Sequence, residues 1–474
     1  MPDQSFSRSM DSFMADDIKT LEEAVARFVV DFDSRHINDD AREAVKRLVK
    51  DQLAIQIGAS QLPWSRQVRK FRNPRPGTAT IVAETFKAAP ADAAYINAAY
   101  GHGFEYDDFA GNAHPGCCVV PTAFAVGEEV GATLEEVTVA LLAGYETYVR
   151  IGRLGSPDLL NAGWQPHSVL ANFGAAATAA KLYGLNAEQT FNALSIALSH
   201  ASGTTEYAST GGSIKRAHAG LAVRNGIESV ELALAGVTGP RRFLTGDRGL
   251  YRTFIRKAVG DEAIDDFALD APLQVEQMSF KAYCCCAANH AYIETMARVR
   301  ERVHEITGVD ARIQTMTDAI VGTRNAHIYA PRNIEELQYS LPVQMALSAL
   351  SMGNGYRTHR DFLEKKLDLS PQSEVIRFAQ LIRLTVSPEL DEKYRFFVAD
   401  VTVRYRDGSS EHIFQERATG SPTRPFTASQ FAAKLTELTT DVISKSQAEA
   451  LFDVIDRHPP DMPIREVTAL LQRG

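Results

Sequence analysis

The sequence lacks the marks of several large classes of protein. It has 474 residues, only five cysteines and a net charge of −9. The cysteines are odd in number and stand side by side, at positions 117–118 and 284–286, so they form a poor disulfide framework and favour a reducing compartment. The excess of acidic residues argues against a broad basic surface for nucleic acid.

Targeting and cofactor motifs are missing as well. The first thirty residues carry Asp, Glu and Lys without a continuous apolar segment, so no signal peptide is expected. No run of eighteen apolar residues occurs, so no membrane span is expected either. Neither G-x-G-x-x-G nor a P-loop pattern is present, which argues against a nucleotide cofactor. We therefore expect a cytoplasmic protein.

What is present is a long helical pattern. Hydrophobic residues make up 45% of the chain, and its length favours two domains. Ala- and Gly-rich periodic segments predict a compact helical bundle, because small side chains let helices approach closely. The segments expected to be helical are 39–57, 121–131, 133–151, 168–183, 187–199 and 221–235.

The pattern changes near residue 270. A helix expected at 289–303 and two more at 342–352 and 359–367 accompany β-type segments, and Asp407-Gly408 is typical of a hairpin turn. The β-type segments are 311–317, 381–386, 399–405 and 411–416. The sequence thus predicts a mainly helical protein with a smaller α+β lid domain at 275–420. Residues 1–274 form the first part of the helical domain, and 421–474 return to it.

One short stretch concentrates polar chemistry. His102 to Gly116 contains two histidines, three carboxylates and three glycines. A helix is expected over 91–109, which would place His102, Glu105 and Phe109 on one face with Asp108 close by. Gly111-Asn112 then breaks the chain and leaves His114 on a loop.

Three interpretations of this stretch remain open. It could be a catalytic site, or a helix end with solvated acids. A metal site of His102, Glu105, Asp107 and His114 is the third, although the spacing matches no established metal signature.

Two further segments lead into helices. Gly163-Trp-Gln-Pro-His-Ser168 puts Ser168 where a helix cap is expected, and His167 could act in a site or only in packing. Ser209 to Gly220 brings Lys215, Arg216 and His218 together after glycines that allow close approach of a ligand. These cations suit a carboxylate substrate, whereas the alternative is a basic surface loop.

A fourth segment lies at the expected domain junction. Phe280 to His290 contains Lys281 and three adjacent cysteines. Lys281 could reach a cleft between domains or be an ordinary surface lysine. The cysteines lack metal-ligand spacing and are interpreted as small packing residues, with a nucleophilic role as the lesser alternative.

Taken in order, these segments resemble the MmgE/PrpD family over nearly the whole chain, from about Thr20 onward. The family's His-x-Leu-Asp-Phe-Asp-Asp-Thr is similar to the segment 102–109, its His-Pro to His114-Pro115, its Thr-Lys-Arg-Leu-His-x-Gly to 214–220, and its Lys-x-Tyr/Phe-Pro-x-Cys/His to 281–286. The family includes 2-methylcitrate dehydratases, cis-aconitate decarboxylases and an iminodisuccinate epimerase.

The resemblance implies a site between two domains, a homodimer and no organic cofactor. It implies a reaction next to a carboxylate of a small di- or tricarboxylate, with His114, Lys215, Lys281, Glu105 and His102 as catalytic residues. The expected substrate-binding residues are Arg216, His218, Asp108, Gln165, His167, Cys286 and Tyr329, and no metal is expected.

The sequence also departs from the family. Glu105 replaces the usual Asp, Phe109 replaces Thr, Gln165 stands where a histidine is usual, and the tyrosine region falls near Tyr329. Dehydration is the favoured outcome, with decarboxylation or epimerisation as alternatives that the same residues support. A metal-dependent enzyme and a catalytically inert carboxylate-binding or scaffolding protein are the two rivals.

Overall fold

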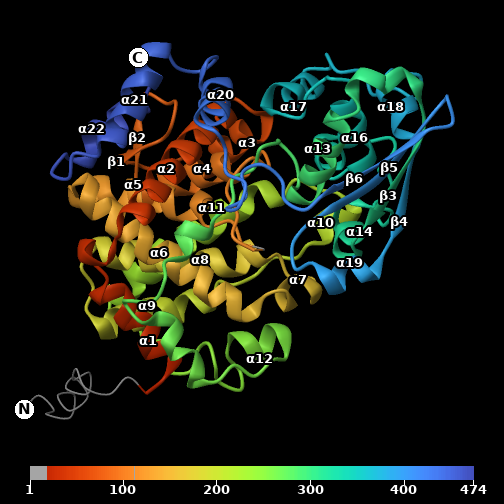
Figure 1. Cartoon of the computed structure of the whole chain (residues 1–474). Helices are drawn as coiled ribbons and strands as arrows, with labels where there is room; N and C mark the ends of the chain where they lie inside the picture. Colours follow the sequence, from red (N-terminus) through yellow and green to blue (C-terminus); the bar gives the residue numbers. More distant parts are fainter. Residues whose placement is uncertain (1–18, 112, 474) are drawn as a thin grey trace, which may run out of the picture.

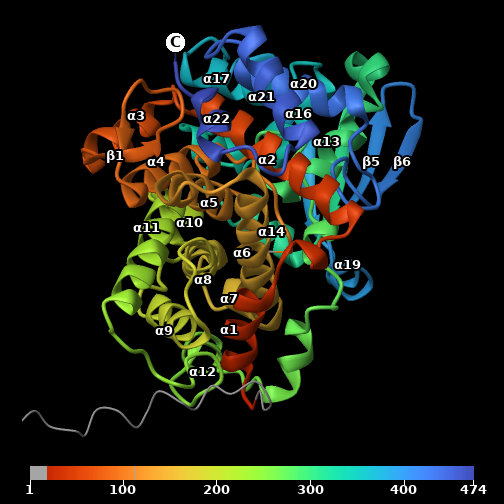
Figure 2. The same ribbon diagram turned by 90° about the vertical axis from the view of Figure 1, so that its left-hand side faces the viewer.

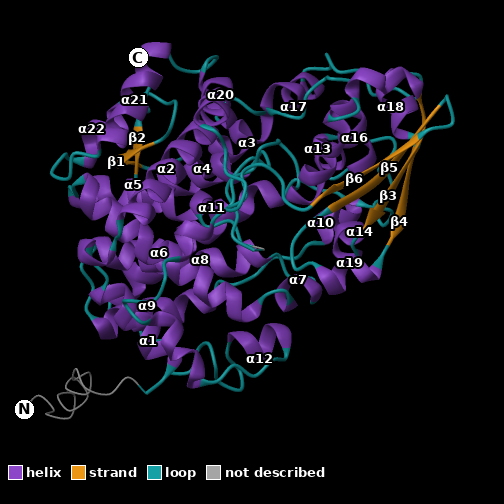
Figure 3. Ribbon diagram, in the orientation of Figure 1, coloured by secondary structure: helices purple, strands orange, loops and turns teal. Residues whose placement is uncertain are grey.

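The computed structural model describes residues 19–111 and 113–473. The polar segment 1–17, whose composition predicts a loose or partner-wrapping terminus, lies outside the described residues. The molecule is mainly helical, with a large helical part on one side and a four-stranded sheet on the other (Figures 1 and 3). The first helices are α1 (Leu21–Asp31), α2 (Asp39–Ala59), α3 (Pro63–Arg72), α4 (Pro90–His102), α5 (Gly116–Val130), α6 (Leu134–Gly155) and α7 (Asp158–Asn161). They are followed by α8 (Pro166–Leu182), α9 (Ala187–Leu198), α10 (Glu206–Thr210), α11 (Lys215–Leu234) and α12 (Leu250–Ile255).

Helix α8 forms the centre of the helical part. It packs against α5, α6, α9 and α11, and Figure 2 shows it surrounded by them. Small residues permit the close approach: a Cβ on Gly144 would meet Thr178 Oγ1, and one on Gly226 would lie 2.5 Å from the Ala175 Cβ. The predicted close packing of Ala- and Gly-rich helices is therefore confirmed.

Side-chain caps fix several helix starts. Thr20 accepts a hydrogen bond from the Glu23 backbone, and Asn186 forms a capping box with Gln189 at the start of α9. The sequence predicted Ser168 as the cap of α8, and this prediction is wrong. The helix begins at Pro166, and Gln165 caps it by accepting a hydrogen bond from the Ser168 backbone.

The second part of the chain forms a sheet with the order β4-β3-β5-β6. Strand β3 is parallel to β4 and antiparallel to β5, and the β5–β6 hairpin turns at Gly408. The strands are β3 (Ile306–Ile313), β4 (Ile382–Val386), β5 (Ala399–Tyr405) and β6 (Ser410–Gln415). The helices of this part are α13 (His290–Ala297), α14 (Thr315–Val321), α15 (Ile334–Gln338), α16 (Leu341–Ala349), α17 (Tyr356–Leu363), α18 (Glu374–Ala379) and α19 (Pro388–Lys393).

The last helices pack back against the first ones. Helices α20 (Ala428–Thr439) and α21 (Lys445–Arg457) contact α2, and α22 (Ile464–Ala469) contacts α5 (Figure 1). A small hairpin of β1 (Pro76–Thr80) and β2 (Lys87–Ala88) lies on the same side. The fold class is as expected, while the boundaries at residues 274 and 420 stay a prediction.

Three expected elements are wrong in their bounds. The helix predicted to reach Phe109 ends at His102, so His102, Glu105 and Phe109 do not share a helix face. The strand expected over 311–317 is β3, Ile306–Ile313, and Thr315 begins α14. The helix expected over 289–303 stops at Ala297 and continues as a 3₁₀ segment, Arg300–Glu305.

Candidate active site

A cleft of about 490 Å³ lies where the helical part meets the second part of the chain. Its polar lining comes from the segment after α4, from α7, α8, α10 and α11, and from the second part of the chain. These polar residues are Glu105, His114, Asn161, Gln165, Thr205, Tyr207, Lys215, Lys281, Cys286, Thr315, Arg324, Tyr339 and Asp391. Several segments far apart in the sequence thus share one cleft, as is usual for small-molecule sites.

The segment after α4 carries the most unusual backbone. Glu105 has a φ of +57°, in the left-handed region that a residue with a side chain rarely adopts. Such a conformation costs about 1–2 kcal/mol and persists only where the surroundings enforce it. It turns the Glu105 side chain toward Lys215 and Lys281 rather than along the axis of α4.

Buried side chains from distant elements hold this segment by its carbonyl groups. Arg216 donates to the Gly103 carbonyl, and Gln338 Nε2 donates to the Phe104 carbonyl at 2.9 Å. Lys434 of α20 donates to the Tyr106 carbonyl at 2.9 Å. These hydrogen bonds fix the backbone on both sides of Glu105, which accounts for its strained conformation.

Glu105 bridges two buried lysines. Its Oε1 pairs with the Lys215 ammonium, its Oε2 lies 2.9 Å from Lys281 Nζ, and the Tyr339 hydroxyl donates to Oε1 at 3.1 Å. Burial, with Lys281 nearby, lowers the pKa of Lys215 well below its usual range, while the contact with Glu105 favours the charged form. The basic surface loop is excluded, because Lys215, Arg216 and His218 are buried.

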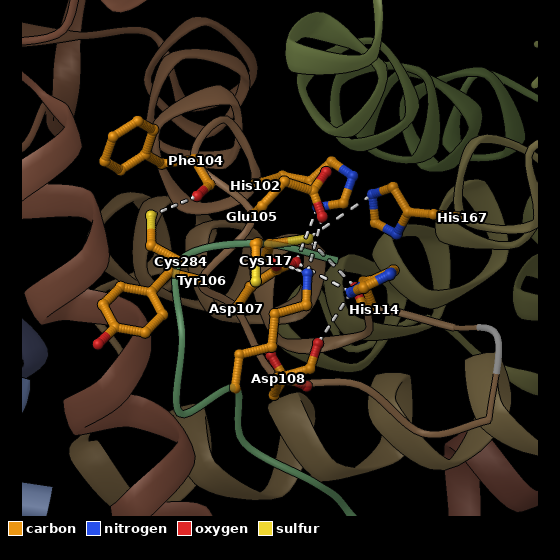
Figure 4. Close-up of polar contacts among 12 residues, drawn as sticks. His102, Phe104, Glu105, Tyr106, Asp107, Asp108, His114, Cys117, His167 and Cys284 are labelled. Carbon is orange, nitrogen blue, oxygen red and sulfur yellow. Dashed lines mark hydrogen bonds and ion pairs between the residues drawn. The ribbon is translucent and has the colours of Figure 1, made fainter. Parts of the chain in front are cut away.

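Asp107 joins two histidines. Its Oδ2 accepts from His102 Nδ1 at 2.7 Å and lies 3.2 Å from His114 Nδ1 (Figure 4). Burial alone would raise the pKa of Asp107, but His114, His102 and Lys281 hold it well below its ordinary value. Asp107 is therefore an anion that can stabilise a protonated His114.

The two histidines differ in their surroundings. The His114 side chain is 18% exposed and lines the cleft, whereas the His102 side chain is fully buried. Burial lowers the pKa of His102 to about 3, so this ring is neutral. His114 Nδ1 also lies 3.0 Å from the Asp108 carbonyl. The Asp107 carboxylate and the Asp108 carbonyl can both only accept, so His114 Nδ1 carries hydrogen.

His167 lies behind this pair. Its ring centre is 4.5 Å from that of His102, and its Nδ1 is 2.7 Å from the Tyr148 hydroxyl. Burial lowers the pKa of His167 well below its usual value. Because it is fully buried and does not line the cleft, it supports the site from behind rather than binding a ligand directly.

Asp108 faces the protein interior. Its carboxylate accepts from the Gly116 backbone at 3.1 Å and from Gln52 at 3.3 Å. Burial, together with the charge of Asp107, raises the pKa of Asp108 to about 7. The carboxylate that contacts His114 and His102 is therefore that of Asp107, not that of Asp108, which was expected to bind substrate.

Of four other expected site residues, two line the cleft and two do not. Gln165 and Cys286 line the cleft, and burial raises the pKa of the Cys286 thiol, which disfavours a thiolate nucleophile. His218 is buried and absent from the cleft lining. Tyr329 is also absent from that lining, because its hydroxyl donates to the Ile382 carbonyl at 2.8 Å.

A second cavity of about 330 Å³, here called the rear cavity, shares Glu105, Lys215 and Tyr339 with the cleft. Arg216 lines it but is occupied by Glu335 at 2.8 Å and stacks over the Trp64 ring at 3.7 Å. The substrate contact expected of Arg216 is therefore replaced by a structural ion pair.

Sequence reasoning missed several polar lining residues, among them two tyrosines and an arginine. Tyr339 donates to Glu105, Tyr207 is hydrogen-bonded to Gln165 and Tyr339, and Arg324 extends from the loop after α14. Burial raises the pKa of Tyr207 to about 12, so it stays a donor. No local motif marks these residues, although the resemblance pointed to a tyrosine ten positions before Tyr339.

Two groups of side chains have spacing that could accept a metal ion. One is His102, Asp107 and His114, and the other is His102, Cys117 and His167. The expected fourth ligand, Glu105, is instead paired with Lys215 and Lys281. The Lys281 ammonium lies 3.5 Å from Asp107 Oδ1 and would repel a metal ion bound to that carboxylate.

Comparison with known proteins identifies the family. The MmgE/PrpD N-terminal domain matches residues 23–261, and the MmgE/PrpD C-terminal domain matches residues 283–457. The chain belongs to the MmgE/PrpD family. No helix in the described part of the chain combines the length and apolar character that a membrane span needs.

Three proteins similar to this chain are cis-aconitate decarboxylases. A cis-aconitate decarboxylase of Aspergillus terreus is 27% identical over 91% of this chain and 92% of its own length. The cis-aconitate decarboxylases of Mus musculus and Homo sapiens are each 22% identical, over 93% and 96% of this chain and 91% and 95% of theirs. Family and relatives together make the chain a lyase-type enzyme.

Proposed function

We propose that the chain is a decarboxylase of an unsaturated tricarboxylate of the cis-aconitate type. The observation that carries this proposal is a cleft in which His114 stands beside two buried lysines, in a chain similar over nine-tenths of its length to cis-aconitate decarboxylases. These relatives favour decarboxylation over the dehydration expected from the sequence. The cytoplasmic location and the homodimer stay predictions.

Lys215 and Lys281 would bind substrate carboxylates. Glu105 lies between them and pairs with both, and Lys281 also lies 3.5 Å from Asp107, so two carboxylates face the two ammonium groups. A substrate carboxylate can share these ammonium groups because each presents more than one N–H donor. Fixed cations in a low-dielectric cleft also stabilise the negative charge that develops as a carbon–carbon bond breaks.

His114 would supply the proton. The bond between the departing carboxylate and its carbon breaks, and its electron pair forms a new double bond to the adjacent carbon. The electron pair of the original double bond forms a new C–H bond at the far carbon of that double bond, and the proton comes from the His114 imidazolium. Carbon dioxide leaves, a dicarboxylate with a terminal double bond remains, and His114 regains its proton from water.

Asp107 and its neighbours would prepare His114 for this step. Asp107 orients the ring through Nδ1 and stabilises its charged form, while the neutral His102 holds Asp107 in place. Tyr339 and Tyr207 keep Glu105 and Gln165 in position at the cleft wall. Asp107 is thus a positioning residue, and His114 is the acid.

The experiment offers the purified protein cis-aconitate, 2-methylcitrate and iminodisuccinate in separate reactions. Nuclear magnetic resonance of carbon-13-labelled substrate follows release of carbon dioxide, loss of water or inversion of a centre. We expect carbon dioxide from cis-aconitate at a rate that the His114→Gln variant does not reach. Release of water from 2-methylcitrate without any decarboxylation would overturn the proposal.

Two rivals are settled by the same preparation. Binding without turnover across the panel favours an inert carboxylate-binding protein, an alternative kept open by Phe109 and Gln165. A metal-dependent enzyme predicts stoichiometric metal and loss of activity with a chelator. We expect activity to survive the chelator, because Lys281 already compensates the charge of Asp107.

A further inference from the structure

Three buried side chains meet behind the cleft, and none of them lines it. They are His102 at the end of α4, Cys117 in the first turn of α5 and His167 in the first turn of α8 (Figure 4). Each residue is at most 1% exposed, and one ligand atom of each lies within 4.8 Å of those of the other two. Imidazole nitrogens and a cysteine sulfur are the ligands that zinc prefers in proteins.

The two imidazoles are oriented as metal ligands are. His102 Nδ1 donates to Asp107 Oδ2 at 2.7 Å. His167 Nδ1 lies 2.7 Å from the Tyr148 hydroxyl, whose oxygen can accept a hydrogen bond. A ligating histidine usually donates its second ring N–H to an outer partner of this kind, which leaves the other nitrogen for the ion. In both rings Nε2 is therefore the atom that can bind a metal.

The Nε2 atoms and the sulfur have suitable surroundings. His102 Nε2 is buried and has no hydrogen bond among the described residues, although a buried polar atom normally has one. His167 Nε2 lies 3.7 Å from Cys117 Sγ. The sulfur and nitrogen ligands of a tetrahedral zinc ion are about 3.6 Å apart, given bond lengths of about 2.3 and 2.0 Å. One pair of ligand atoms thus has the required separation, and the third atom lacks another partner.

This group needs no carboxylate as a ligand. The alternative group of His102, Asp107 and His114 would share Asp107 with Lys281, whereas Cys117 supplies its own negative charge once its thiol proton is released to solvent. An ion also has a route of entry, because His102 lines the rear cavity. Water in that cavity can complete the coordination, as in other zinc sites with three protein ligands.

We propose that Cys117, His102 and His167 bind one zinc ion, which joins the ends of α4, α5 and α8 behind the cleft. The ion lies outside the cleft lining, so it stabilises the fold and takes no part in the reaction. Helix α5 already packs against both α4 and α8, so the protein also folds without the ion. With three protein ligands instead of four, binding should be reversible.

The test titrates zinc into the full chain after treatment with a chelator. Calorimetry should show one zinc ion per chain, and cobalt in its place should give the near-ultraviolet absorption of a thiolate–cobalt bond. Cys117→Ser should weaken zinc binding at least about 100-fold, because even the outer partners of metal ligands change affinity by about 10- to 100-fold. Cys118→Ser is the matched control, since Cys118 is equally buried but donates to the Ala171 carbonyl at 3.6 Å.

A second variant keeps the test decisive if Cys117→Ser fails to fold. His167→Asn retains a partner for the Tyr148 hydroxyl and should lose zinc affinity by a similar factor. Zinc should also raise the unfolding temperature of the wild type and of Cys118→Ser, but not that of the two ligand variants. Absence of zinc binding, or wild-type affinity in either folded ligand variant, overturns the inference. The decarboxylase proposal is unaffected by either result, because these measurements use no substrate.

Discussion

The Nδ1 atom of His114 lies 3.2 Å from the Oδ2 atom of Asp107, and the carboxylate is completely buried while the imidazole reaches the cleft. An anion placed behind an imidazole fixes which nitrogen carries hydrogen and favours the charged ring. The other nitrogen of His114 is then the one available to a substrate. In this pair the proposed acid lies at the surface of the cleft, and the anion that supports it lies in the protein interior.

Replacing His114 by Gln should lower kcat by about 10²- to 10⁴-fold, the usual contribution of a positioned general acid. The fold should persist, because the side chain is partly exposed and lines a cavity. Steady-state kinetics with cis-aconitate and circular dichroism check both statements. His412→Gln is the control, because His412 is 61% exposed on β6. Wild-type kcat in His114→Gln would remove this residue from the mechanism.

Asp107→Asn should lower kcat by about 10²-fold through misorientation of His114, with a smaller change in KM. The split between kcat and KM provides the specific readout. Without the anion His114 is misoriented while the lysines still bind the substrate, so kcat should fall and KM should change little. A general loss of structure would change both. Asp407→Asn, at the exposed turn before β6, is the control.

Lys215→Met should lower kcat/KM by about 10- to 100-fold, the range expected for a lost hydrogen bond to a charged group. The variant leaves Glu105 paired with Lys281 and Tyr339, so the protein should remain folded. Kinetics over a wide range of substrate concentration separate the loss of binding from the loss of rate. Lys445→Met changes a 90% exposed lysine and should behave like the wild type. A Lys215→Met enzyme with unchanged kcat/KM contradicts the proposed contact with substrate.

Asp108 should make stability depend on pH. Burial raises its pKa from 3.8 to about 7, so the folded state binds more protons than the unfolded state between these values. This contribution to stability is full below pH 3.8 and is lost as the pH rises through 7. Asp108→Asn should therefore be more stable relative to wild type at pH 8 than at pH 5.

Denaturant midpoints at several pH values measure this effect. The asparagine amide has a partner at hand, because Gln52 Oε1 is buried and lacks a hydrogen bond among the described residues. The same difference in midpoint at pH 5 and pH 8 would show that Asp108 is ionised in the folded protein at both.

Much of the fold was predictable because helices and strands leave local signals. The capping residues Thr20 and Asn186 mark helix starts, and the alternating segment at 399–405 coincides with β5. The end of α4 was not predictable in the same way. Polar and aromatic residues after His102 are compatible with a helix, and the turn at Glu105 is imposed by Arg216, Gln338 and Lys434, which lie far away in sequence.

The candidate site was predictable to the extent that its residues stand in motifs. His114, Lys215 and Lys281 were selected from local patterns and do line one cleft. The partner of His114 was not predictable, because the sequence alone does not show which of three carboxylates within four residues faces the imidazole. Only the path of the backbone decides that Glu105 faces the lysines, Asp107 the histidines and Asp108 the interior. Tyr339 belongs to no motif and is brought in by the second part of the chain.

Lys434 has a consequence for the biosynthesis of this protein. It joins the Tyr106 carbonyl to Asp51, which it contacts at 2.7 Å, and it lies more than three hundred residues after the segment it holds. During translation every proposed catalytic side chain leaves the ribosome well before α20 does. The nascent chain therefore contains every proposed catalytic residue before their cleft has formed. Its cleft is shaped only when one of the last helices docks, so partially synthesised chains should not act on substrate.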